Sequence, residues 1–160
     1  MRADILACYG DTMIDKMIEF VTGEKVTHMA MIIDDANEYV IDTGWCGVKI
    51  SKLSSFRGKY YVYRCSKLTD MDKTEICSDA LSLLNKPYDY LQLLQLFLYK
   101  LFHMRVYIGE REKFICVEVI VRLFRKRGIT LVPHADADFI FPENVIESKE
   151  LTIMGKGVFG

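Results

Sequence analysis

The sequence predicts an α+β fold in which a small antiparallel sheet packs on helices. Several segments carry apolar residues at helical spacing, and short runs of β-branched and aromatic residues lie between them. Two of these runs are separated only by a polar turn, which favours an antiparallel hairpin. With 160 residues, the chain fits a single domain spanning residues 1–160 and can bury a core without disulfide staples.

The first half of the chain alternates predicted strands with one helix. Aliphatic spacing, turn residues and β-branched or aromatic runs define each element. The predicted elements are a buried strand at 3–8, a helix at 12–21 that stops at Gly23, a hairpin formed by 27–33 and 38–43, and a strand at 59–65.

The second half is predicted to be mainly helical. Thr69 or Asp70 can cap the first helix, Gly128 can end the third, and Pro142 suits a first helical turn. The predicted elements are helices at 70–84, 91–104 and 114–127, a strand at 129–133, a helix opening at 141–148 and a last strand at 150–155. The strongly apolar helix at 91–104 is shorter than the roughly 20 residues that span a bilayer.

Composition excludes several classes of function. Lys and Arg number 21 against 22 acidic residues, so the net charge of −1 gives no general attraction to nucleic acid, and we expect no nucleic-acid partner. Asp4 and Asp11 interrupt the N-terminal apolar run, so no signal peptide is indicated and we expect a cytoplasmic protein without stable membrane insertion. The five cysteines form no CxxC pair, and we expect neither a disulfide framework nor a metal or other cofactor.

Cys116 has the features of a nucleophilic thiol. It lies at the start of a predicted helix, where the dipole and free N–H groups lower a thiol pKa. Arg111 and Lys113, just upstream, would add positive potential. A cysteine in an apolar helix is more commonly a small core residue, however, so this position alone leaves both interpretations open.

The predicted hairpin offers a base and an acidic partner for that thiol. If its loop has an odd number of residues and paired positions sum to 70, His28 lies directly opposite Asp42, within reach of a hydrogen bond. An even loop would place the two side chains on opposite faces and remove the pairing. Glu38 is the alternative acidic partner.

Six motifs occur in the order found in one known family. They are ADILACYGD near the N-terminus, THMAMII with His28, VIDTGWCGVKI with Asp42 and the Gly47–Val48 pair, KPYDY, FICVEVI with Cys116, and FPENVIESKEL. In this order the chain resembles the permuted papain-like amidases of the NlpC type, specifically the YiiX-like group. It departs from that group at Val117, where serine is common, and at Asp42, where glutamate is usual.

The resemblance implies a circularly permuted papain-like fold, with a small antiparallel sheet or barrel packed on helices. It implies that Cys116 is the catalytic nucleophile, His28 the base and Asp42 the residue that orients the imidazole. The implied reaction is hydrolysis of an amide bond in a small peptide or a cell-wall-derived peptide, through a thioester intermediate. The backbone N–H of Cys116 would belong to the oxyanion hole, with Tyr107 as a conceivable second donor.

Other interpretations stand beside this one. A thiol acyltransferase or lipase-like enzyme acting on acyl lipids would suit the apolar helix at 91–102, although such a helix is more commonly core, and a non-catalytic binding module of the same fold is a third possibility. His134, Asp136 and Asp138 alternate like metal ligands but equally resemble a polar loop. The basic residues 122 and 125–127 could form a patch for an anionic partner, but completing the helix dipole is the better explanation. The sequence leaves the oligomeric state open.

Overall fold

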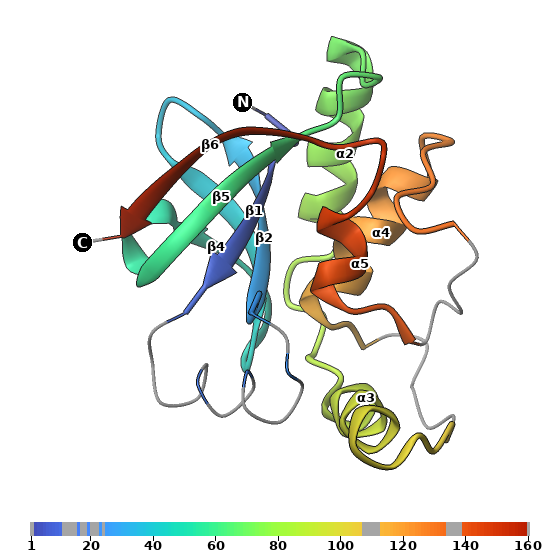
Figure 1. Ribbon diagram of the computed structural model, residues 1–160. Coiled ribbons are helices and arrows are strands. Elements are labelled where there is room, and N and C mark those ends of the chain that lie inside the picture. The colour runs from blue at the N-terminus through green and yellow to red at the C-terminus, as the bar shows by residue number, and fades with distance from the viewer. Residues whose placement is uncertain are drawn as a thin grey trace.

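The computed structural model describes residues 2–10, 16, 19, 23, 25–106, 113–133 and 139–159 (Figure 1). Within them the strands are β1 (Ile5–Tyr9), β2 (His28–Asp34), β3 (Tyr39–Gly44), β4 (Gly47–Lys52), β5 (Gly58–Arg64) and β6 (Thr152–Phe159). The helices are α2 (Asp70–Ser82), α3 (Tyr90–Phe102), α4 (Cys116–Arg125), α5 (Pro142–Ile146) and the 3-10 turn η1 (Leu53–Ser55).

The strands form one six-stranded antiparallel sheet in the order β4-β3-β2-β1-β5-β6. Helices α2, α4 and α5 lie to one side of this sheet, and α3 lies apart at one end of the molecule (Figure 1). The prediction of an α+β fold with a small antiparallel sheet is therefore confirmed. The permuted papain-like connectivity that the resemblance implies stays a prediction.

Two parts of the predicted strand pattern need correction. Strand β4 was not predicted; it pairs with β3 along its whole length, from Gly47 opposite Gly44 to Lys52 opposite Tyr39. The predicted strand at 129–133 is irregular chain that belongs to no strand of the described sheet, yet Leu131 in it is fully buried. Its apolar residues therefore contribute core contacts. In the sequence, a short apolar run of this kind looks the same as a buried strand. The predicted helix at 12–21 lies outside the described residues apart from positions 16 and 19, which are helical.

Alternation along the central strands divides the buried residues into two clusters. In β2, Met29 and Met31 face the main core between sheet and helices, whereas Ala30 and Ile32 face a smaller cluster on the other side of the sheet. Both strands of the β1–β2 pair are buried on both faces, which explains why their sequences read as continuous apolar runs.

Helix α4 packs on strands β2 and β3 and also contacts α2 and α5. It buries a broad aliphatic face and leaves Glu118 and Arg122, 3.7 Å apart, toward solvent. Beyond its end, Arg127 forms ion pairs with Glu75 and Asp79 of α2. The basic residues there thus join two helices, in addition to complementing the helix dipole as predicted.

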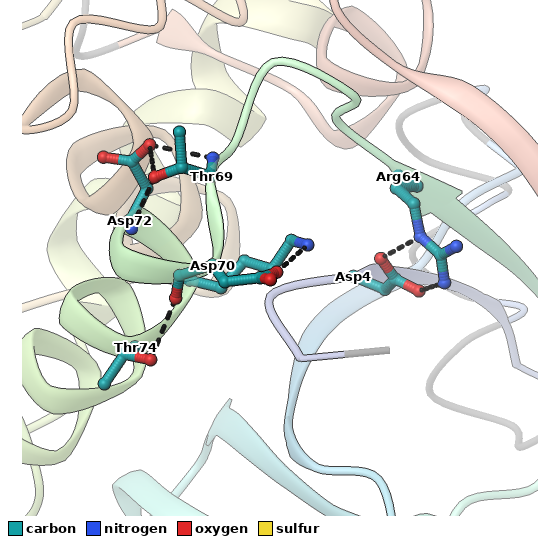
Figure 2. A network of polar contacts seen from close by, with 7 residues as sticks. Asp4, Arg64, Thr69, Asp70, Asp72 and Thr74 are labelled. Carbon is teal, nitrogen blue, oxygen red and sulfur yellow. Dashed lines mark hydrogen bonds and ion pairs between the residues drawn. The ribbon is translucent and has the colours of Figure 1, made fainter.

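Polar contacts fix the start of the first strand and the start of α2 (Figure 2). Asp4 has a side chain that is only 2% exposed, and Arg64 donates to both of its carboxylate oxygens at 2.8 and 2.6 Å. Thr69 caps α2 through a reciprocal capping box with Asp72, as one of the two predicted cap positions. The Asp4–Arg64 pair therefore joins the beginning of β1 to the end of β5.

We predict that Asp4→Ala destabilises the protein by about 2 kcal/mol, because it removes a bidentate ion pair whose carboxylate is buried. The effect should fall below that for a wholly buried pair, since Arg64 keeps access to solvent. Urea denaturation followed by circular dichroism measures it. Lys67→Ala, which removes the solvent-exposed cation paired with Glu150, serves as the control and should leave the midpoint unchanged. Equal midpoints for Asp4→Ala and wild type would contradict the structural role of the pair.

Candidate active site

The β2–β3 hairpin places His28 and Asp42 on the same face of the sheet by way of a register irregularity. Asp34 pairs with Tyr39 and encloses a four-residue loop, which alone would set Asp42 opposite Met31 and away from His28. A register shift between Ile32 and Asp34 moves the pairing by one residue, so that Asp42 pairs with Ala30. Ala30 and His28 are two residues apart on the strand and therefore share one face. The predicted register, with His28 directly opposite Asp42, is therefore wrong by two residues, and the two side chains are diagonal neighbours.

The diagonal arrangement still allows a direct hydrogen bond. Nε2 of His28 donates to Oδ1 of Asp42 at 2.6 Å, a contact within reach of a long side chain. The other carboxylate oxygen accepts from the hydroxyl of Ser51 at 3.1 Å and lies 3.6 Å from Nζ of Lys49. Asp42 is largely buried, so these three partners hold its carboxylate in a fixed orientation.

Cys116 is the first residue of α4, two residues after the predicted helix start at 114, and its sulfur lies near the start of β2. The N-cap residue Ile115 is extended and supplies no side-chain cap, so the first N–H groups of α4 are left without that partner. The thiol lies within hydrogen-bond reach of the His28 imidazole and of the backbone N–H of Met29. The structure thus brings Cys116, His28 and Asp42 together, while their catalytic role stays a prediction.

The ionisation of the three groups is interdependent. Burial alone would lower the pKa of His28, but its hydrogen bonds to Asp42 and Cys116 outweigh burial and raise the pKa to about 10. Burial disfavours the Cys116 thiolate, yet the hydrogen bond and charge of His28 hold the pKa of Cys116 below its usual value. The pKa of Asp42 is likewise lowered by His28 in spite of burial. Each of the three shifts thus acts in the direction of the charged form: a carboxylate at Asp42, an imidazolium at His28 and a thiolate at Cys116.

An aromatic cluster lies beside the thiol. Burial and the nearby charge of Cys116 raise the pKa of Tyr88, so its hydroxyl stays protonated at neutral pH. Tyr88 packs against Tyr90 with ring centroids 5.1 Å apart, and Trp45 lies 6.0 and 5.7 Å from these two rings. Trp45 and Tyr90 are about half exposed. The cluster therefore extends from the thiol to the molecular surface.

Backbone contacts connect the segment before α3 with the segment before α4. The N–H of Asp89 donates to the carbonyl of Phe114 at 3.1 Å, and the N–H of Phe114 donates to the carbonyl of Pro87 at 3.1 Å. Asp89 also caps α3 by accepting from the N–H of Gln92 at 2.8 Å. These bonds place Tyr88 next to the residues that lead into Cys116.

Gly47 is required where β4 meets this segment. Its φ is +91°, and a Cβ there would lie 2.2 Å from the carbonyl oxygen of Lys86. That oxygen accepts from the N–H of Val48 at 2.9 Å. The Gly47–Val48 pair noted in the sequence thus has a physical role, because it allows the chain that carries Tyr88 to approach β4.

His28 also borders an open cavity. Phe56 lies over its ring with centroids 6.0 Å apart and 24° between the planes. Together with Thr27 and Arg57, they line a cavity of about 330 Å³. A substrate in this cavity would meet the imidazole directly.

Other predicted residues have different positions. Glu38, the alternative partner of His28, is exposed at the hairpin turn with φ of +55°, so it does not take the place of Asp42. Tyr107, Arg111 and the possible metal ligands His134, Asp136 and Asp138 lie outside the described residues.

Sequence reasoning missed Ser51, Phe56 and the proximity of Tyr88 to the thiol. Predicting β4 would have revealed Ser51, because residues 49 and 51 share the face of Asp42 in a paired strand. Phe56 and Tyr88 come from loops, whose positions leave no periodic signal.

Comparisons with known proteins support the fold. No family model matches the sequence, and no curated protein matches it significantly. A crystal structure of the metalloprotein YiiX from Escherichia coli O157:H7, of family DUF1105, superimposes with a TM-score of 0.73, covering 99% of this chain and 98% of that one at 17% identity. This superposition shows that the chain has a YiiX-like fold. Within the described part of this chain, no group of three or more His, Cys, Asp or Glu could hold a metal ion.

Proposed function

We propose that this protein is a cysteine-dependent hydrolase that cleaves an amide bond in a small or cell-wall-derived peptide through a thioester intermediate. The proposal rests on one observation. The His28 imidazole bonds to Asp42 at 2.6 Å and also reaches the thiol of Cys116 at the start of α4. Nucleophile, base and orienting carboxylate in contact are the parts that this chemistry needs.

The proposed reaction begins from the thiolate–imidazolium pair. The Cys116 sulfur attacks the amide carbonyl carbon, and the carbonyl π electrons move to oxygen. When the C–N bond breaks, His28 gives its proton to the leaving amine and the acyl group remains on sulfur as a thioester. His28 then takes a proton from water, whose oxygen attacks the thioester carbonyl carbon. The C–S bond breaks, the carboxylic acid leaves, and the thiolate–imidazolium pair is regenerated. Asp42 keeps the imidazole in place throughout.

The developing oxyanion needs hydrogen-bond donors near the thiol. The backbone N–H of Cys116 lies in the uncapped first turn of α4, where the helix dipole also favours negative charge. Tyr88 is a second candidate donor among the described residues, because its hydroxyl stays protonated and the ring lies close to Cys116.

A second candidate function is thiol chemistry on acyl lipids. One observation favours it: the aromatic cluster beside Cys116 continues onto exposed leucine and phenylalanine side chains of α3. A peptide substrate does not require such an apolar approach, whereas an acyl chain does.

We predict that Cys116 reacts with iodoacetamide well below neutral pH, because His28 lowers the pKa of its thiol. In His28→Ala, burial of the thiol is no longer opposed, so labelling should rise only near or above the free-cysteine pKa of about 8.5. At pH 6 the variant should react on the order of 100-fold more slowly.

Mass-spectrometric peptide mapping measures this labelling, with the exposed Cys46 of each protein as an internal reference. Superimposable pH profiles for Cys116 in the two proteins would show that His28 does not activate the thiol. The protein would then be a non-catalytic binding module.

We also predict that Asp42→Asn lowers the pKa of His28 from about 10, because burial then opposes the imidazolium without the carboxylate to offset it. An NMR titration of the His28 ring proton measures the change. Glu38→Gln makes the same change of charge at the exposed turn of the hairpin and should leave the His28 titration unaltered. A shift in Glu38→Gln with none in Asp42→Asn would assign the orienting role to Glu38.

A further inference from the structure

The cavity beside His28 lies on the face of the sheet that carries the smaller apolar cluster. Cys8 is a buried member of that cluster and Phe56 packs against it, and both residues line the cavity. The side chain of His28 is 23% exposed, so a ligand in the cavity can touch the imidazole. The cavity volume of about 330 Å³ is at the lower end of the range for small-molecule sites. The cavity can therefore hold a fragment of a substrate next to the candidate base.

Positive charge lines this cavity. None of its described lining residues is Asp or Glu, and Arg57 among them carries a permanent charge. The imidazole of His28 adds a second positive charge when it is protonated, and its partner Asp42 is not among the described lining residues. A ligand here would meet cations, with no competing carboxylate from the described wall.

Arg57 is not engaged by another group. Within the part of the chain that the structure describes, it forms no hydrogen bond, ion pair or ring contact. The hydroxyls of the lining, in contrast, are in use: Ser55 donates to the carbonyl of Lys52 at 2.6 Å, and Thr27 accepts from the N–H of Gly10 at 3.1 Å. Arg57 is exposed, so its guanidinium is open to a ligand.

The composition of the lining indicates which part of a substrate the cavity takes. His28 lines the cavity, whereas Cys116 is not among the described lining residues. In the proposed reaction the acyl group stays on the sulfur, while the imidazole gives its proton to the leaving nitrogen. The part of the substrate that lies against His28 is therefore the leaving amine.

We propose that Arg57 binds a carboxylate on the leaving-amine part of the substrate, so that the released amino acid or short peptide carries a negative charge near the cleaved bond. This inference rests on the proposed hydrolysis and adds the class of substrate to it. The planar guanidinium can donate to both oxygens of a carboxylate, which is the anion that a peptide offers. That carboxylate belongs either to the end of the peptide chain or to an acidic side chain.

A lipid substrate would instead offer a headgroup phosphate to Arg57. The described parts of the chain contain no helix that is long and apolar enough to cross a membrane. Lipid headgroups are typically recognised by clusters of Lys and Arg, whereas Arg57 is the only Lys or Arg among the described lining residues. This single guanidinium favours one carboxylate.

Alkylation of Cys116 with charged and neutral reagents tests the site without requiring turnover. One charged reagent is N-bromoacetylglycine, which has a terminal carboxylate, and the other is bromoacetylated aspartic acid amide, which has a side-chain carboxylate. Their neutral references are N-bromoacetylglycinamide and bromoacetylated asparagine amide. Each rate at Cys116 is divided by the rate at the exposed Cys46 of the same sample, which removes the intrinsic difference between reagents.

We expect a carboxylate reagent to react faster at Cys116 than its neutral reference, by a ratio that falls as salt is raised. Arg57→Gln should lower this ratio roughly threefold, as the loss of an exposed ion pair does. Because the imidazolium of His28 also attracts anions, the change between variants is the measure of Arg57. Arg57→Lys, which keeps the charge but not the planar fork, should give an intermediate ratio. The reagent whose ratio falls identifies the terminal or the side-chain carboxylate.

The matched control is Lys59→Gln, which removes the same charge two residues away, outside the described lining, and should leave the ratio unchanged. Unchanged rates with the neutral reagents establish that each variant keeps its folded site. Equal ratios in wild type and Arg57→Gln for both charged reagents would overturn the proposal. So would alkylation that inorganic phosphate slows through Arg57 and acetylglycine does not, which would assign the cavity to a phosphate group. A ratio that falls in Arg57→Gln, in a protein that cleaves no peptide, would support the carboxylate site and overturn the hydrolysis.

Discussion

The packing of α4 on β2 and β3 is the contact on which the candidate site depends. The helix buries its aliphatic face against the sheet, including Ile120, Leu123 and Phe124, so the position of its first residue is set by the core. Strand β2 presents Met29 and Met31 to that core and turns His28 to the other side. The thiol can meet the imidazole only where the described β2–β3 ladder ends, beyond the Ala30–Asp42 pair. Core packing and strand pairing together thus place groups that no local segment could align.

Charge then makes the three groups dependent on one another. Each of Asp42, His28 and Cys116 is partly or largely removed from water, which disfavours its ionised form. The alternation of negative, positive and negative charge offsets that cost for all three. Removing the central imidazole would therefore leave two partly buried acidic groups without their shared cation, a larger disturbance than the loss of one hydrogen bond.

The sequence was sufficient for those features that have a periodic or chemical signature. The strands around residues 5, 30, 41 and 61, the helix that begins with Cys116 and the Thr69 cap all have such signatures. The register of Asp42 could not be predicted, because the shift between Ile32 and Asp34 depends on how the loop closes. The exposure of the α3 leucines was equally out of reach, since an apolar helix looks the same whether its surroundings are protein or not. The apolar run at 129–133 was mistaken for a strand for a related reason, because burial alone does not specify pairing.

The two backbone hydrogen bonds between residues 87–89 and Phe114 have a thermodynamic consequence. They fasten the first turn of α3 to the chain that enters α4, so a tilt of α3 must either carry Phe114 along or break these bonds. A ligand on the exposed apolar side of α3 that prefers one tilt of the helix then alters the free energy of the thiol's position. By reciprocity, an adduct on Cys116 changes the affinity of that side of α3 for the ligand by the same factor. Ligand binding at α3 and modification of Cys116 are thus thermodynamically linked. An occupant of either position can be detected by a binding or labelling titration at the other.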